Sequence, residues 1–102
     1  TKNFSFIMDK TGKWKLAPAF DVCHSYRPDS TWVSQHSMSI NGKRQNITRN
    51  DLLQVAQKMN IKKADTIINQ VRDAVSKWDE FAKQTEVKKD LKEAIAKTLL
   101  LL

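Results

Sequence analysis

The feature that most constrains the fold is the absence of glycine and proline after Gly42, which leaves a long uninterrupted C-terminal part. In this part apolar residues recur at steps of three and four, the period of an amphipathic helix. The clearest series is Ala64, Ile67, Ile68, Val71, Val75, Trp78 and Phe81. The pattern predicts a helix that begins at Lys62 and continues through this series.

Two further helices are predicted on either side. Thr48 has the side chain of an N-cap and Asp51 suits the first turn, so a helix is expected from Thr48 to about Asn60. Thr85 is expected to cap a third helix, whose apolar face extends to Leu102. Residues 48–102 are therefore predicted to form a three-helix bundle.

Residues 1–47 show the alternation of β-strands instead. In the first segment Phe4, Phe6 and Met8 face one side, and a turn ending in Gly12 separates it from a second alternating segment over 13–16. Asn41-Gly42 predicts a second hairpin, with Lys43 and Arg44 at its exposed tip. The tip is either a solvated turn or a contact for phosphate or an acidic partner. The predicted fold class is α+β, mainly α, with N-terminal β-hairpins followed by the three-helix bundle.

The first hairpin places two oxygen-bearing side chains near each other. Asn3 precedes its first strand and Asp21 follows its second, so both are expected at the open end. Carboxylate and amide oxygens suit a hard cation such as Mg²⁺. The alternative is that both residues serve only as capping or turn residues.

The run from Lys2 to Asp21 resembles the C-terminal catalytic segment of the HipA-like serine/threonine kinases, the toxins of bacterial toxin–antitoxin systems. The matching motifs are Lys-Asn-Phe-Ser at its start and Pro-Ala-Phe-Asp at its end, and residues 36–53 are also similar. The resemblance implies that Asn3 and Asp21 bind Mg²⁺. It implies that Lys2 and Phe20 line the phosphate end of bound ATP, so that Lys2, Asn3, Phe20 and Asp21 form the nucleotide site.

The chain departs from the family pattern at its beginning. The family's catalytic base is an Asp five residues before the Asn, which would fall upstream of Thr1. The Gly-rich phosphate loop and the ATP-binding Lys also belong to the upstream half. The resemblance therefore implies that residues 1–47 and 48–102 form one domain or subdomain of a larger kinase, like part of a kinase C-terminal lobe. We expect the isolated chain to be inactive.

Cys23 is the only cysteine, which excludes a disulfide within the chain and favours the cytoplasm. We expect its side chain to be buried as a small apolar group. His24 beside it is expected to be a loop or packing residue, because a zinc site needs more ligands. No apolar run approaches the ~20 residues that cross a membrane, so no membrane contact is predicted.

The net charge of +7 lies entirely in residues 1–63, which suits nucleotide phosphates, nucleic acid or an acidic protein. The resemblance implies a protein substrate, an antitoxin and DNA reached through their complex. An alternative function is a non-catalytic module that binds an antitoxin or DNA through the basic N-terminal part. In a third hypothesis, residues 48–102 form a helical bundle that only supports the catalytic lobe.

Overall fold

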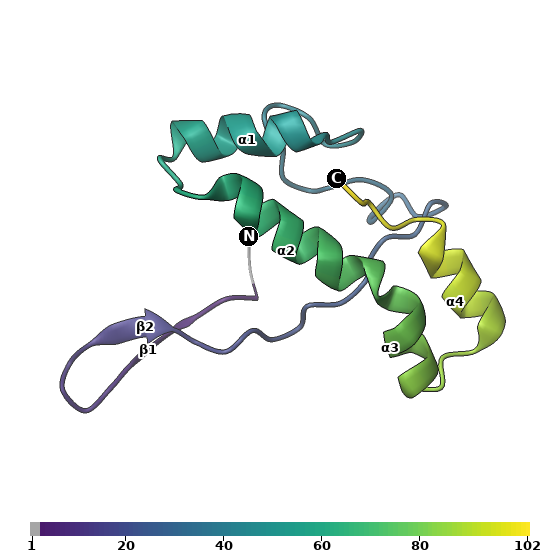
Figure 1. The fold of residues 1–102 in the computed structure, drawn as a ribbon, viewed down its shortest axis with the longest axis horizontal. Coiled ribbons are helices and arrows are strands. Elements are labelled where there is room, and N and C mark those ends of the chain that lie inside the picture. Colours follow the sequence, from purple (N-terminus) through teal and green to yellow (C-terminus); the bar gives the residue numbers. More distant parts are fainter. Residues whose placement is uncertain (1–2) are drawn as a thin grey trace.

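A computed structural model describes residues 3–102 of the chain. It contains one β-hairpin, followed by a long irregular segment and then helices in succession (Figure 1). The strands are β1 (Phe6–Met8) and β2 (Trp14–Leu16), and the helices are α1 (Arg49–Lys58), α2 (Ala64–Ser76), α3 (Trp78–Gln84) and α4 (Lys89–Ala96). The α+β, mainly helical fold class is confirmed.

The first predicted hairpin is present. β1 and β2 pair antiparallel with Phe6 opposite Leu16 and Met8 opposite Trp14, so these four side chains share one face. The turn closes through the Asp9 N–H, which donates to the Lys13 carbonyl at 2.9 Å, and Gly12 has the positive φ of 83° that the turn needs. Neither strand contacts a helix, and the hairpin extends away from the helices (Figure 1).

The second predicted hairpin is reduced to a turn. Asn41 and Gly42 have φ values of 51° and 79°, as a type I′ turn requires, but only Ile40 and Lys43 pair across it. The ladder does not extend because the chain turns at Asn46, whose φ is 52°, and enters α1. The predicted turn at Asn41-Gly42 is therefore confirmed, while the prediction of two strands flanking it was wrong.

Helix α1 begins and ends where the sequence indicated. Thr48 is its N-cap and forms a capping box with Asp51. At the other end Asn60 takes a left-handed φ of 53°, and the Ile61 N–H donates to the Ala56 carbonyl at 2.8 Å. This bond satisfies one of the last helical carbonyls and stops the helix.

The predicted helix over 62–82 is two helices. It starts later, at Ala64, and it breaks at Lys77 between α2 and α3. The indole N–H of Trp78 donates to the Lys92 carbonyl at 3.0 Å, which holds the start of α3 against α4. No glycine or proline marks this break. The prediction, which relied on the spacing of apolar residues, therefore continued the helix through Lys77.

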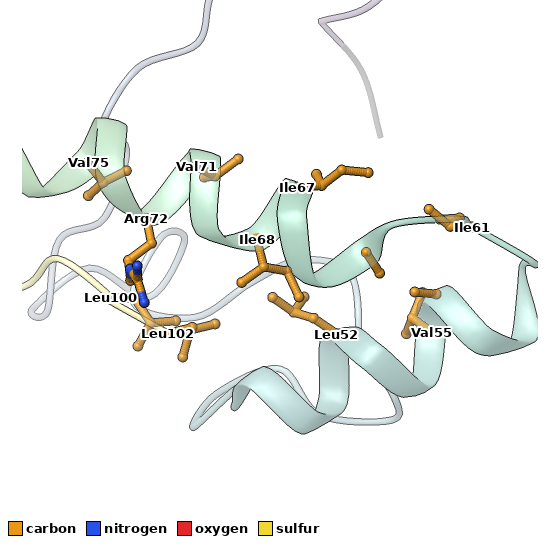
Figure 2. A pocket seen from close by; sticks show the side chains of 12 residues that line it. Leu52, Val55, Ile61, Ile67, Ile68, Val71, Arg72, Val75, Leu100 and Leu102 are labelled. Atoms are coloured by element: carbon orange, nitrogen blue, oxygen red, sulfur yellow. The ribbon is translucent and has the colours of Figure 1, made fainter.

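The predicted third helix is also shorter. Thr85 does not cap it but closes α3, and its hydroxyl donates to the Phe81 carbonyl at 2.9 Å. Helix α4 begins after Lys88 and ends at Ala96, and residues 99–102 are not helical. The three-helix bundle is thus replaced by four shorter helices, and the C-terminal leucines return toward α2 (Figures 1 and 2).

The apolar core is small. Among the described residues only Ile47, Ala56 and Ala82 are buried apolar side chains. The facing sides of α1 and α2, together with Leu100 and Leu102, surround an open apolar cavity of about 350 Å³ (Figure 2). Cys23 is exposed, so the prediction of a buried thiol was wrong. No helix within residues 3–102 is long and apolar enough to span a membrane.

Asp79 on α3 forms an ion pair with Lys92 on α4, so the stability of the fold should depend on pH in the acid range. Hydrogen bonds from Lys83 and Lys92 to the Asp79 carboxylate lower its pKa to about 2. Because this folded-state pKa lies below the ordinary value of 3.8, Asp79 stabilises the fold above about pH 4. That contribution is lost as the pH falls toward 2.

We therefore expect Asp79→Asn to lower the midpoint of thermal unfolding near pH 6 and to lower it much less near pH 2, where folded Asp79 becomes protonated, as measured by circular dichroism. Asp90→Asn on α4 is the matched control, because the Asp90 carboxylate forms no ion pair among the described residues. An Asp79→Asn effect of the same size at both pH values would contradict the assignment.

Candidate metal and nucleotide site at the open end of the hairpin

The hairpin brings Asn3 and Asp21 together at its open end. The Ala17 N–H donates to the Ser5 carbonyl at 2.9 Å, which continues the β1–β2 pairing by one step. Beyond it, the Asn3 side-chain amide donates from Nδ2 to the backbone carbonyl of Asp21 at 3.3 Å. The two predicted metal ligands are therefore neighbours, although eighteen positions separate them in the sequence.

Both residues have left-handed backbone conformations, with φ of 69° at Asn3 and 53° at Asp21. Asn and Asp tolerate this conformation better than other residues with side chains. The chain therefore bends sharply at each end of the hairpin. These bends, together with the amide hydrogen bond, hold the Asn3 side chain against the backbone of Asp21.

The oxygen atoms of the site are available to a ligand. In the part of the chain that the structure describes, neither Asn3 Oδ1 nor the Asp21 carboxylate has a hydrogen-bond or ion-pair partner. The Asp9 carboxylate, by contrast, accepts from the Thr11 N–H, the Thr11 hydroxyl and the Lys13 N–H. These bonds lower the pKa of Asp9, and its carboxylate stabilises the turn.

This donor set fits Mg²⁺ only in part. One carboxylate and one amide oxygen are hard ligands of the right kind, but Mg²⁺ needs six oxygens, so water or phosphate must supply the rest. Residues 3–102 contain no group of three or more His, Cys, Asp or Glu side chains placed to hold a metal without such help. The site therefore suits a metal that arrives with phosphates.

The other two predicted nucleotide-site residues are placed less fully. Phe20 directly precedes Asp21 and is 47% exposed, so its ring is open to a ligand. Lys2 lies outside the described residues. Their proposed contacts with ATP stay predictions.

The sequence did not reveal the role of Asp51 beyond helix capping. Its carboxylate is 2% exposed and accepts hydrogen bonds from Asn41 Nδ2 at 3.0 Å and from Lys43 Nζ at 2.9 Å. It also accepts from the Thr48 N–H and hydroxyl at 2.9 and 2.7 Å. Lys43 is thus paired within the fold, which argues against its proposed role as a free phosphate contact.

His24 is an exposed residue of the irregular segment, in keeping with the expectation of a loop or packing residue. Its Nε2 lies 2.9 Å from the hydroxyl of Thr98, and its ring meets Tyr26 edge to face. These contacts tie the segment after Asp21 to the end of α4.

Residues 1–78 match the family model of the HipA-like C-terminal domain. This range includes the hairpin, the candidate site, α1 and α2. No curated protein and no solved structure matches the chain.

Proposed function

Because the chain belongs to the HipA-like C-terminal domain family, we propose that it supplies the metal-binding part of an ATP- and Mg²⁺-dependent serine/threonine protein kinase of the toxin type. Its partners in this proposal are a protein substrate and an antitoxin, with DNA reached through the complex, in the cytoplasm. The catalytic base and the ATP-binding loop lie upstream of Thr1.

The observation that carries the proposal is the pairing of Asn3 with Asp21 at the hairpin mouth. Phosphoryl transfer needs little covalent help from the protein, because positioning and neutralisation of phosphate charge supply most of the catalysis. Bound Mg²⁺ would supply that neutralisation. Asn3 Oδ1 and the Asp21 carboxylate would hold it, while the Nδ2 hydrogen bond fixes the orientation of the amide so that its oxygen faces away from the Asp21 carbonyl.

Phe20 and Lys2 complete the proposed site. The exposed Phe20 ring gives one wall beside Asp21, and Lys2 adds positive charge near the phosphates. Without a catalytic base, the 102-residue chain binds the metal–nucleotide complex but does not turn it over.

The test uses Mn²⁺ in place of Mg²⁺, because Mn²⁺ broadens nearby NMR signals. We expect substoichiometric Mn²⁺ with ATP to broaden the amide signals of Asn3, Phe20 and Asp21 in the ¹⁵N-labelled chain, since hard-oxygen sites accept both ions. Asp21→Asn removes a charged ligand and should abolish this broadening.

Asp29→Asn is the matched control, because Asp29 is an exposed loop carboxylate without a hydrogen-bond or ion-pair partner among residues 3–102. Broadening that survives in Asp21→Asn, or that is lost equally in Asp29→Asn, would contradict the assignment of the site. Hydrolysis of ATP by the isolated chain would contradict the upstream location of the base.

A further inference from the structure

A second cavity, of about 870 Å³, lies away from the hairpin. It is bounded by the irregular segment 24–47 on one side and by residues 97–100 on the other. Its lining includes the apolar side chains of Ile47, Val75 and Leu99 and the serines and histidines of the irregular segment. Its volume is within the range of cavities that bind small ligands.

The cavity is cationic. Arg44 and Lys97 line it, and no Asp or Glu does. Among the described residues neither cation forms an ion pair, in contrast to Lys43, Arg49, Arg72 and Lys92 elsewhere in the chain. Arg44 uses Nε to donate to the His36 carbonyl at 2.7 Å, and its two terminal nitrogens have no hydrogen-bond partner among the described residues.

His24 adds a further polar group of defined orientation. The Thr98 hydroxyl donates its only proton to the Ile95 carbonyl at 2.7 Å, so it must accept from His24. The proton of neutral His24 therefore resides on Nε2, and Nδ1 remains without a partner among the described residues.

Trp32 supplies a flat apolar surface at the same cavity. It is 86% exposed, the most exposed of the large apolar side chains described. Its backbone N–H is tied to the Ser30 hydroxyl at 3.2 Å, so the ring is presented from an ordered turn. An exposed indole that lines the same cavity as two cationic groups favours a ligand that combines a planar ring with negative charge.

We propose that this cavity binds a phosphate monoester joined to a planar ring, with Arg44 and Lys97 contacting the phosphate and Trp32 stacking on the ring. Guanidinium groups match phosphate geometry, and two unpaired cations balance a phosphate of about −2 charge at neutral pH. A free nucleotide and a phosphotyrosine side chain both have this chemistry. The site is separate from Asn3 and Asp21 and does not need a metal.

The test titrates the ¹⁵N-labelled 102-residue chain with ligands in EDTA, which keeps the proposed metal site out of the measurement. One arm compares adenosine monophosphate with adenosine, and the other compares a phosphotyrosine peptide with its tyrosine counterpart. We expect one phosphorylated ligand to shift amides near His24, His36 and Thr98, and its unphosphorylated counterpart to bind at least about tenfold more weakly. The arm that responds identifies the source of the phosphate.

The variants localise the contact. Arg44→Gln/Lys97→Gln should weaken binding by at least about tenfold, and Trp32→Ala by about fivefold or more. The matched control Lys10→Gln/Lys13→Gln removes the same charge from the hairpin and should change affinity by less than about twofold. The double variant loses the hydrogen bond from Arg44 to the His36 carbonyl, which could disturb the loop. The single variant Lys97→Gln keeps this bond and should still weaken binding.

No binding of either phosphorylated ligand would overturn the proposal. Equal binding of the phosphorylated and unphosphorylated forms, or equal weakening by the hairpin control, would also overturn it. The metal test at Asn3 and Asp21 is independent of this one, because it relies on Mn²⁺ and on different residues.

Discussion

Replacing Asp51 with alanine lowers the midpoint of thermal unfolding by roughly 10 °C. The reason is that one buried carboxylate satisfies four donors from three places in the chain: Asn41, Lys43 and both the N–H and hydroxyl of Thr48. Without it, the cap of α1 is lost and these donors lose their common acceptor. The same bonds hold the pKa of Asp51 far below its usual range, so the stabilisation persists at neutral pH and is lost only in strong acid.

The matched control for this change is Asp90→Ala. Asp90 also occupies the first turn of a helix, but it is exposed, and no bond to its carboxylate is found within residues 3–102. Its replacement should lower the midpoint by no more than a few degrees, since only the interaction with the helix dipole is lost. Similar losses in the two variants, measured by circular dichroism at pH 7, would show that Asp51 is merely a first-turn acid.

If the proposed kinase function is right, we expect changing Asp21 to asparagine to lower phosphoryl transfer by about 10²–10³-fold in a longer protein that carries these residues together with an ATP-binding half. The substitution keeps the size of the side chain and the backbone carbonyl that Asn3 contacts, but it removes the negative charge that would hold the metal. The loss should appear mainly in kcat. Raising the Mg²⁺ concentration should restore part of the rate.

Asp29→Asn in the same protein gives the comparison, because it removes an equal charge from the loop that follows the site. We expect its activity to stay within about twofold of the unmodified protein. A rate for Asp21→Asn within tenfold of the unmodified protein would refute the metal-binding role. In that case the basic binding module would become the better explanation of the sequence.

Local chemistry in the sequence predicted the parts of the fold that depend on neighbours in the chain. The turn at Gly12, the turn at Asn41-Gly42 and the cap at Thr48 are all present. The break at Lys77 was missed because no local residue marks it, and the contact that accompanies it, from Trp78 to Lys92, joins residues fourteen positions apart. The third helix was predicted to be too long. The apolar residues Leu99–Leu102 fit the spacing of a helix face, but an extended segment that returns toward α2 can have the same sequence.

The candidate site divides in the same way. The meeting of Asn3 and Asp21 follows from the hairpin, and the hairpin follows from alternation around one turn. The hydrogen bond between His24 and Thr98 joins residues seventy-four positions apart, so no local sequence pattern could predict it. The Thr48–Asp51 spacing indicated a cap, but the additional bonds from Asn41 and Lys43 depend on where the preceding turn folds back.

The isolation of the hairpin has a consequence for hydrogen exchange. Since β1 and β2 contact each other but no helix, they can separate without disturbing α1–α4. A two-stranded hairpin is only marginally stable in water, so the amides of Asp9 and Ala17 should exchange through frequent local opening, largely independent of global unfolding. A metal–nucleotide complex bound across Asn3 and Asp21 would slow exchange at these amides while leaving the helices unchanged, so ligand binding and strand pairing would form a single local equilibrium.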